Sequence, residues 1–265
     1  MEREIWSVEK IRSLFDMTGK TAVVTGGSGA FGGEAAKALA AYGANVVITS
    51  RRAENLEATA ASIKEATGSE VLAVSCDCVD PDSVEAMVQK TVDTFGSLDV
   101  LITAAGQANR FPAEEFPIDE WEKVMDSLVK GTYLCCQSAG RQMIKQGSGK
   151  IITVGSVRGE FGHPGGYSAY GTAKGAVHLL TKQLATEWAK YHINVNSIAP
   201  CIFWTPLTQQ VIENPELKAI FLSRIPWGRV ADPQDFIGAV LYLSSAASDF
   251  VTGAILAVDG GSTAG

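Results

Sequence analysis

The chain has 265 residues, 46% of them hydrophobic and 19% charged, and its formal net charge is −7. This composition is typical of a globular protein and excludes a disordered, fibrous or membrane-embedded chain. The acidic balance argues against nucleic acid or an anionic membrane surface as the main partner.

The predicted elements, in chain order, are short β-branched runs that alternate with longer helical patterns. The predicted strands are 21–25, 45–50, 70–76, 98–103, 150–156, 193–199 and 254–261. The predicted helices are one that ends near Gly43 and others at 53–67, 81–95, 118–144, 167–191 and 233–243. Apolar strands that alternate with helices form a parallel sheet covered on both faces. The sequence therefore predicts an α/β fold, a single doubly wound parallel seven-stranded sheet of the Rossmann type.

Two segments fall outside this alternation of strands and helices. Residues 1–18 precede the first strand and are interpreted as an N-terminal arm, whereas residues 19–265 form one domain. Residues 201–230 contain three prolines and no clear period, which is typical of a lid or substrate loop.

The N-terminus and the cysteines bear on the setting of the protein. The N-terminus lacks the apolar core of a signal peptide, and no apolar run approaches the length of a membrane span. The five cysteines have neither the spacing nor the neighbouring histidines of a metal site. We therefore expect a cytoplasmic protein with reduced thiols and no bound metal.

The first predicted strand runs directly into the sequence TGGSGAFG at 25–32, after which a helix begins. Gly27, Gly29 and Gly32 match the pattern G-x-G-x-x-G at this first strand-to-helix turn. Glycines there let the backbone approach a pyrophosphate, whose charge is stabilised at the helix N-terminus. The pattern predicts a bound dinucleotide, and the alternative is a tight turn that binds nothing.

The second predicted strand ends in Ser50-Arg51-Arg52, eighteen residues after Gly32. An NAD-binding protein usually has an acidic residue here that holds the 2′-hydroxyl of the adenosine ribose. Ser50 does not repel a 2′-phosphate, and the Arg51 guanidinium can pair with one through two hydrogen bonds. These residues favour NADP, with NAD as the alternative cofactor. A second alternative is that Arg51 and Arg52 only begin a solvated helix.

Seven motifs in chain order resemble those of the short-chain dehydrogenase/reductase family. They are TGGSGAFG, CDCVD (76–80), TAAG (103–106), IITVGS (151–156), YGTAK (170–174), NVNSIAP (194–200) and VDGG (258–261). The stretches 14–27, 185–200 and 224–253 are similar to those of sugar-acid and polyol dehydrogenases such as gluconate 5-dehydrogenases. The resemblance implies an oxidoreductase that interconverts a secondary alcohol and a ketone on a small hydroxylated substrate.

The resemblance makes Tyr170 the catalytic acid/base, with Lys174 and Ser156 as its catalytic partners. Lys174 would bind the nicotinamide ribose and lower the pKa of the phenol, and Ser156 would hydrogen-bond the substrate oxygen. Residues four apart share one helix face, so Lys174 can lie beside Tyr170. A phenol has an ordinary pKa of about 10, and a neighbouring cation favours its ionised form, which makes it a better catalyst near neutral pH.

The resemblance also implies cofactor contacts, and the loop after Ser156 and the segment 201–230 indicate substrate contacts. The expected cofactor-binding residues are Gly26, Ser28, Gly29, Phe31, Gly32, Ser50, Arg51, Asp77, Ala105, Gly106, Tyr170, Lys174, Pro200, Ile202 and Thr205. The expected substrate residues are Arg158, His163 and Trp204. Arg158 would suit a charged substrate such as a sugar acid, although a single arginine or histidine in a loop is more often only solvated.

The chain departs from the family pattern at four positions. Ala30 stands at a usual glycine of the loop, Ala104 at a usual asparagine, and Cys201 at a usual glycine. Leu128 aligns with an asparagine that helps hold a water in a proton relay from the lysine. Because leucine cannot form a hydrogen bond, the relay must use another group or be weaker.

The leading prediction is an NADP-dependent oxidoreductase of a polyol, sugar acid or similar small molecule. The resemblance implies a homotetramer formed through residues 233–261. Rival predictions within the enzyme class are a 3-oxoacyl-thioester reductase and a cyclic-ketone reductase with an apolar pocket. From another class, Leu128 and Ala104 favour a non-catalytic, cofactor-binding regulatory protein, which the retained catalytic residues oppose.

Overall fold

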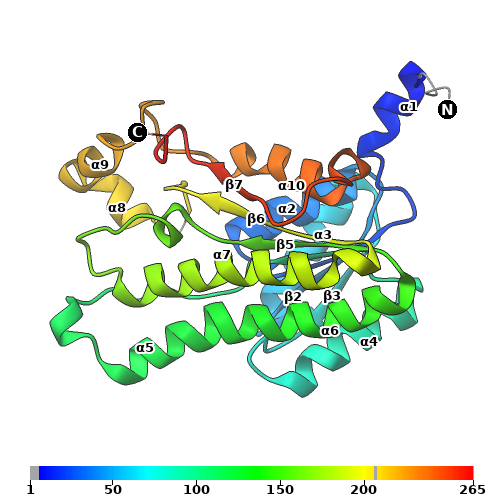
Figure 1. Cartoon of the computed structure of the whole chain (residues 1–265), viewed down its shortest axis with the longest axis horizontal. Helices are drawn as coiled ribbons and strands as arrows, with labels where there is room; N and C mark the ends of the chain where they lie inside the picture. The colour runs from blue at the N-terminus through cyan, green and yellow to red at the C-terminus, as the bar shows by residue number, and fades with distance from the viewer. Residues whose placement is uncertain (1–5, 206–207, 265) are drawn as a thin grey trace.

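The computed structural model describes residues 6–205 and 208–264. A sheet of seven parallel strands runs through them in the order β3-β2-β1-β4-β5-β6-β7 (Figure 1). The strands are β1 (Thr21–Thr25), β2 (Asn45–Ser50), β3 (Val71–Ser75), β4 (Val100–Thr103), β5 (Gly149–Val154), β6 (Ile193–Pro200) and β7 (Ile255–Val258). The strand order reverses between β1 and β4, which is the doubly wound arrangement predicted from the sequence.

Helices cover both faces of the sheet, as Figure 1 shows. One face carries α2 (Ala30–Ala41), α3 (Ala53–Thr67) and α10 (Ile237–Ser244). The other face carries α4 (Pro81–Phe95), α6 (Gly131–Gln146) and α7 (Ser168–Trp188). Successive strand residues point to opposite faces, so Val24 belongs to the first apolar core and Val23 to the second.

The helix ends follow local sequence signals. The Asp80 side chain accepts a hydrogen bond from the Asp82 amide at the start of α4, and Pro81 occupies the first turn. Gly96 ends α4 in the left-handed conformation. These signals explain why the predicted and observed bounds of this helix agree.

Two predicted segments differ in the structure. The helix predicted at 118–144 is divided into α5 (Ile118–Met125), a π-helical turn at Asp126–Lys130, and α6. The segment 201–230, which lacks a clear period, contains the short helices α8 (Gln209–Glu213) and α9 (Pro215–Leu222).

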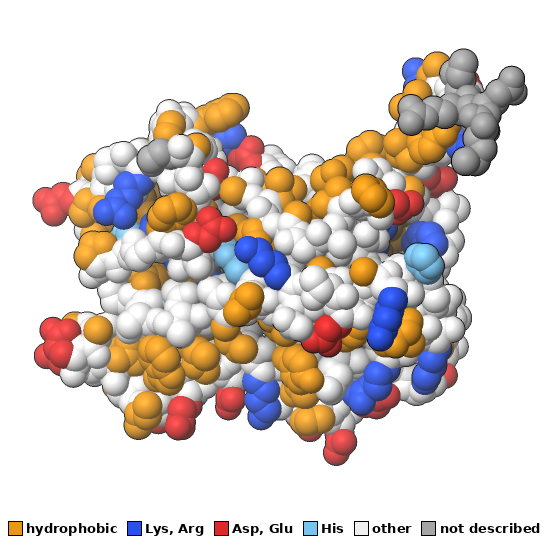
Figure 2. All heavy atoms as spheres, viewed as in Figure 1, with side chains coloured by type: hydrophobic (Ala, Val, Ile, Leu, Met, Phe, Trp, Pro, Cys, Tyr) orange, Lys and Arg blue, Asp and Glu red, His pale blue; other side chains and the backbone are white. Residues whose placement is uncertain are grey.

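The remaining helix, α1 (Val8–Arg12), stands away from the sheet and its covering helices (Figure 1). Figure 2 shows hydrophobic side chains on this projecting part of the chain. Trp6, Ile11 and Phe15, in and beside α1, are among its exposed apolar residues. At the opposite side of the molecule, the carboxyl ends of the parallel strands meet at one edge of the sheet. Residues that follow the strands are therefore brought together there.

Candidate active site

The turn between β1 and α2 is built from backbone packed against backbone. Gly26 has φ +66°, and the Gly29 amide donates a hydrogen bond of 2.8 Å to the Gly26 carbonyl. A Cβ on Gly32 would lie 2.2 Å from that carbonyl oxygen, and a Cβ on Gly26 would lie 2.8 Å from the Ala104 oxygen. The first amides of a helix have no partner within the helix. This cradle therefore fits a dinucleotide pyrophosphate at the N-terminus of α2.

The ends of β2 and β3 extend this site away from β4. The Ser50 hydroxyl donates to the Arg52 carbonyl at 3.2 Å, and the Arg51 side chain is exposed. The Asp77 carboxylate accepts a hydrogen bond from the Val79 amide at 3.2 Å. Ser50, Arg51 and Asp77 thus lie on the side of the glycine turn where the adenosine of a dinucleotide would be held.

A cleft of about 270 Å³ lies on the other side of the glycine turn, at the ends of β4, β5 and β6. The predicted site residues that line it are Phe31, Ala105, Gly106, Ser156, Arg158, Tyr170, Lys174, Pro200, Ile202 and Thr205. They come from five separate parts of the chain and are brought together only by the fold. Gly26, Ser28, Gly29 and Gly32 lie outside the lining of the cleft, in the turn described above.

Tyr170 and Lys174 project from the first two turns of α7. The Lys174 ammonium lies 5.7 Å from the centre of the Tyr170 ring and donates a hydrogen bond of 2.6 Å to the Val154 carbonyl. Burial lowers the pKa of Lys174 to about 8. Burial also raises the pKa of Tyr170, although the Ser156 hydroxyl and the charge of Arg158 act in the opposite direction. In the protein chain by itself, loss of solvation outweighs these two opposing effects. The predicted lowering of the phenol pKa also depends on the charge of the oxidised nicotinamide and stays a prediction.

Ser156 follows β5 and is 5% exposed. Its hydroxyl accepts a hydrogen bond from the Arg158 amide at 3.1 Å and lies 3.5 Å from the Pro200 carbonyl oxygen, to which it donates. Ser156 and Tyr170 both line the cleft, and the Ser156 hydroxyl acts to lower the pKa of Tyr170. The extra residue between Ser156 and Tyr170 is accommodated in the loop 157–167, and both residues still line the same cleft.

Leu128, at the position expected to hold an asparagine, lies in the π-helical turn that interrupts the helix. Its side chain is 4% exposed and lines the cleft next to Gly106. A Cβ on Gly106 would lie 2.2 Å from the Leu128 Cδ2 atom, so the leucine packs directly against the backbone of Gly106. Val124, Ala169 and Ala173, which form one buried cluster with Leu128, are apolar.

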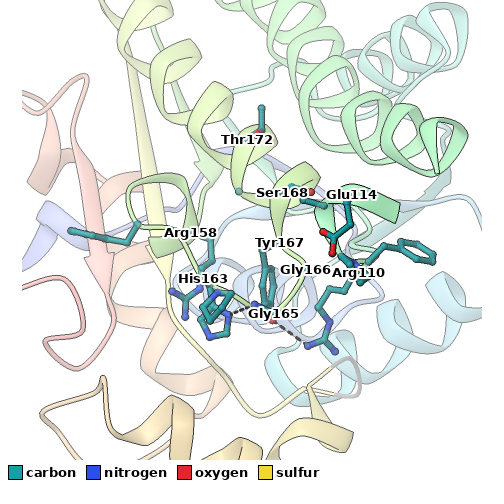
Figure 3. Close-up of a pocket in the computed structure, with 16 residues that line it drawn as sticks. Arg110, Glu114, Arg158, His163, Gly165, Gly166, Tyr167, Ser168 and Thr172 are labelled. Carbon is teal, nitrogen blue, oxygen red and sulfur yellow. Dashed lines mark hydrogen bonds between the residues drawn. The ribbon is translucent and has the colours of Figure 1, made fainter. Parts of the chain in front are cut away.

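A second hollow, of about 720 Å³, adjoins the cleft and shares Arg110, Arg158 and Tyr167 with it. Figure 3 shows these side chains, and Arg110 donates a hydrogen bond of 3.3 Å to the Tyr167 hydroxyl. The Arg158 guanidinium lies 6.0 Å from the centre of the Tyr167 ring. His163 stacks on Phe221 of α9, with ring centres 5.2 Å apart. Helix α9 therefore packs against the loop that follows β5.

The lining of the hollow has more arginines than carboxylates. Within residues 6–205 and 208–264, no carboxylate forms an ion pair with Arg110, Arg158 or Arg224. Burial lowers the pKa of His163, and the charges of these three arginines lower it further. Glu114 is the acidic residue in the lining of the hollow. The arrangement can hold an anionic group beside the cleft.

Some predicted residues lie elsewhere, and the sequence analysis missed others. Trp204 is 44% exposed and lines neither hollow, and His163 lines only the outer one. Arg110 received no role in the sequence analysis, although it stands four residues after the TAAG motif. His178 also received none, yet the structure buries it beneath Ser156. Its position eight residues after Tyr170 on one helix was the available signal.

The described residues have no group of three or more His, Cys, Asp or Glu side chains arranged to hold a metal ion. All five cysteines are free thiols. Among the helices described, none combines the length and the apolar character needed to cross a membrane.

Known proteins with similar sequences and structures are consistent with this geometry. A family model described as enoyl-(acyl carrier protein) reductase matches residues 26–263. The gluconate 5-dehydrogenase of Gluconobacter oxydans (strain 621H) is 39% identical over 250 residues, covering 94% of this chain and 97% of that protein.

Two solved structures extend the comparison to the fold. A short-chain type dehydrogenase/reductase from Mycobacterium marinum has 35% identity and a TM-score of 0.92, over 96% of this chain and 100% of that one. A gluconate 5-dehydrogenase from Burkholderia cenocepacia J2315, in complex with NADP and tartrate, has 33% identity and a TM-score of 0.91, over 96% and 98%. Since motifs, fold and nearly full-length similarity agree, the chain belongs to the short-chain dehydrogenase/reductase family of oxidoreductases.

Proposed function

We propose that the protein is an NADP-dependent oxidoreductase that interconverts a secondary alcohol and a ketone on a sugar acid or polyol. The observation that carries the proposal is the convergence of Ser156, Tyr170 and Lys174 on one cleft, next to a glycine cradle that fits a dinucleotide. A protein that only bound the nucleotide would have no physical need for this arrangement.

The proposed chemistry of the protein residues concerns the proton on the substrate oxygen. Bound nicotinamide would supply or accept the hydride at the substrate carbon. The raised pKa of Tyr170 keeps the phenol protonated at neutral pH, so in reduction it donates its proton to the oxygen of the forming alcohol. In oxidation the phenolate accepts that proton, and the Lys174 cation stabilises the phenolate. The Ser156 hydroxyl donates a hydrogen bond to the same substrate oxygen and holds it near the phenol.

The residues at the ends of β2 and β3 support NADP as the cofactor. The glycine turn would hold the pyrophosphate, and Asp77 would lie near the adenine. Ser50 is neutral, and no ion pair within the described residues engages Arg51, so its guanidinium is available to a 2′-phosphate. The similar gluconate 5-dehydrogenase from Burkholderia cenocepacia was solved with NADP, which supports the same choice.

The basic hollow supports an acidic substrate. Arg158 is half-buried, lines both the cleft and the outer hollow, and has no carboxylate partner among the described residues. A guanidinium in this position would pair with a substrate carboxylate while the reacting carbon lies near Tyr170. The relatives that act on gluconate agree with a sugar acid as the substrate.

Initial rates, followed by nicotinamide absorbance, test this function. NADP(H) and NAD(H) are each supplied with sugar acids, uncharged polyols, cyclic ketones and 3-oxoacyl thioesters. We expect turnover of sugar acids or polyols, faster with NADP(H). Arg158→Gln should raise KM for a sugar acid more than KM for an uncharged polyol of the same chain length. Nucleotide binding without turnover of any class would contradict the proposal and favour a regulatory protein.

A thioester reductase is the second candidate, because the family model that matches residues 26–263 is described as an enoyl-(acyl carrier protein) reductase. The arginines beside the cleft would then contact the phosphopantetheine of a carrier. Turnover of the 3-oxoacyl thioesters, with none of the sugar acids, would favour this candidate.

The homotetramer remains part of the proposal and rests on family resemblance. Residues 233–261, which include α10 and β7, are the segment that would form the contact between subunits. Sedimentation equilibrium should give four times the mass of the chain, and a monomer would contradict this assignment.

A further inference from the structure

His178 lies on the same helix stripe as the two catalytic residues of α7. Tyr170, Lys174 and His178 are spaced four residues apart, which places them on successive turns of one helix face. The His178 side chain is buried, with 6% of the residue exposed. A buried imidazole in this position requires hydrogen-bond partners.

Both imidazole nitrogens of His178 face the loop that carries Ser156. The Ser156 amide donates a hydrogen bond of 3.4 Å to Nε2, and the Glu160 carboxylate lies 3.9 Å from Nδ1. Because Nε2 accepts this bond, the neutral imidazole must carry its proton on Nδ1, facing Glu160. The ring therefore joins the catalytic helix to the loop at the point where Ser156 leaves β5.

Two glycines show how closely the loop is wrapped around the ring. A Cβ on Gly155 would lie 2.3 Å from the His178 Nε2 atom, and a Cβ on Gly159 would lie 2.8 Å from Cε1. Ordinary side chains cannot occupy either position without displacing the imidazole or the loop. The loop backbone on both sides of Ser156 is thus shaped around this histidine.

We propose that His178 is a positioning residue that fixes the Ser156 hydroxyl relative to Tyr170, and that protonation of its Nε2 atom abolishes this positioning. The inference rests on the proposed function, because it assigns Ser156 the task of holding the substrate oxygen. In the neutral form, His178 ties the backbone of Ser156 to α7, which also carries the acid/base. In the protonated form, Nε2 becomes a donor and faces the donor N–H of Ser156, so the contact becomes repulsive.

The groups around His178 favour the neutral form at neutral pH. Burial lowers the pKa of His178, and the charges of Lys174 and Lys182 on α7 lower it further. Glu160, from the loop after β5, acts in the opposite direction. The proposed loss of positioning is therefore expected only under acidic conditions, below the ordinary histidine pKa of about 6.5.

Two substitutions separate positioning from general packing. His178→Leu removes the acceptor, and His178→Gln provides a carbonyl acceptor that does not titrate. We expect kcat to fall about 10- to 100-fold in the leucine variant, since small displacements of reacting groups cost this much. NADPH affinity, measured by fluorescence titration, should change less than about twofold in both variants, because neither contacts the nucleotide turn. The glutamine variant should recover most of the rate at neutral pH.

The pH profile of kcat is the second readout. The wild-type rate should decline on the acid side as His178 becomes protonated, and the glutamine variant should lack this step. His192→Asn is the control, because His192 is exposed, has φ +58° that asparagine tolerates, and lies beyond the end of α7 at Trp188. The control should keep the wild-type profile. Three results would each overturn the proposal. The first is a wild-type kcat in the His178→Leu variant, and the second is a His178→Gln variant as slow as His178→Leu. The third is a pH profile of His178→Gln that keeps the decline on the acid side.

A spectroscopic measurement distinguishes failure of this inference from failure of the proposed function. In ¹⁵N-labelled protein, the Ser156 amide resonance should shift with pH as His178 titrates, and this shift should vanish in the glutamine variant. The measurement needs no substrate. An enzyme without turnover would contradict the proposed function alone. A Ser156 amide resonance that does not shift as His178 titrates, or that shifts equally in the glutamine variant, would overturn the inference.

Discussion

The two halves of the sheet contribute to the candidate site in different ways, the first mainly through backbone atoms and the second mainly through side chains. In the first half, from β1 to β3, the site consists mainly of backbone, and its decisive contacts are carbonyls that leave no room for a Cβ at Gly26 or Gly32. In the second half, from β4 to β7, side chains from loops, α7, α8 and α9 line the cleft. The first site depends on chain conformation, and the second depends on which distant residues meet.

The comparison teaches that the two halves should respond differently to substitution. A single added methyl group should damage the first half, since its contacts are between backbone atoms that cannot move apart independently. The second half should lose activity when one functional group is removed, even where the backbone keeps its conformation. Four experiments test this contrast, from the largest expected effect to the smallest.

Tyr170→Phe removes one hydroxyl from the second half and should reduce kcat by about 10²- to 10⁴-fold, the usual contribution of a general acid/base. NADPH affinity should be nearly unchanged, because the glycine turn is intact. Stopped-flow rates and fluorescence titration measure the two quantities. Tyr167→Phe is the matched control, since Tyr167 hydrogen-bonds Arg110 and its removal should cost only a few-fold. A phenylalanine variant at 170 with near wild-type rate would show that another group moves the proton.

Gly32→Ala tests the first half. Its Cβ would lie 2.2 Å from the Gly26 oxygen, so the turn must open, and we expect NADPH to bind about 10- to 100-fold more weakly. Gly33→Ala is a control one residue away. A Cβ on Gly33 would lie 3.5 Å from the Gly27 carbonyl oxygen, which is an ordinary van der Waals contact, and alanine has a higher helix propensity than glycine. The NADPH affinity and Tm of this control should therefore be no lower than those of the wild type. Equal effects of the two substitutions would contradict the backbone-cradle description.

Arg51→Ala tests whether the first half selects its nucleotide by one side chain. Loss of a charge-assisted hydrogen bond should weaken NADPH binding about tenfold and leave NADH binding nearly unchanged. Arg52→Ala is the control and should affect both nucleotides equally. Isothermal titration of both nucleotides gives the comparison, and equal losses at Arg51 would argue against a 2′-phosphate contact.

Asp235→Asn tests the turn before α10, which joins the halves because Phe236 packs against Phe31 of α2. Asp235 forms a two-point ion pair with Arg229, at 2.7 and 2.8 Å, and caps the Asp232 amide at 2.8 Å. We expect a loss of about 0.5–1 kcal/mol in the free energy of unfolding, since the pair is partly exposed.

The pH dependence of this loss is also specified. Hydrogen bonding to Arg229 lowers the pKa of Asp235 to about 2, below its ordinary value. The stabilisation is therefore complete above the ordinary Asp pKa of about 3.9 and disappears as the pH falls towards 2. Urea unfolding of wild type and variant at several pH values measures the difference. Glu70→Gln, at an exposed pair with Lys64, should show a smaller effect. A difference independent of pH would contradict the ion-pair explanation.

The sequence was informative wherever function depends on local conformation. The alternation of strands and helices specified the sheet, because buried parallel strands need apolar runs and crossover helices. The glycine spacing predicted the nucleotide turn for the same local reason, since only glycine fits where backbone meets backbone. The position of Lys174 beside Tyr170 likewise followed from their four-residue spacing, because residues four apart share one helix face.

What only the tertiary structure decided was the surroundings of these residues. Burial set the direction of the Tyr170 pKa, Leu128 closed one wall of the cleft from within a π-helical turn, and His178 reached Ser156 across a loop. Arg110 joined Arg158 only because the loops after β4 and β5 meet. Solvation and contacts between distant segments depend on the packing of the whole chain, and no spacing within the sequence encodes them separately.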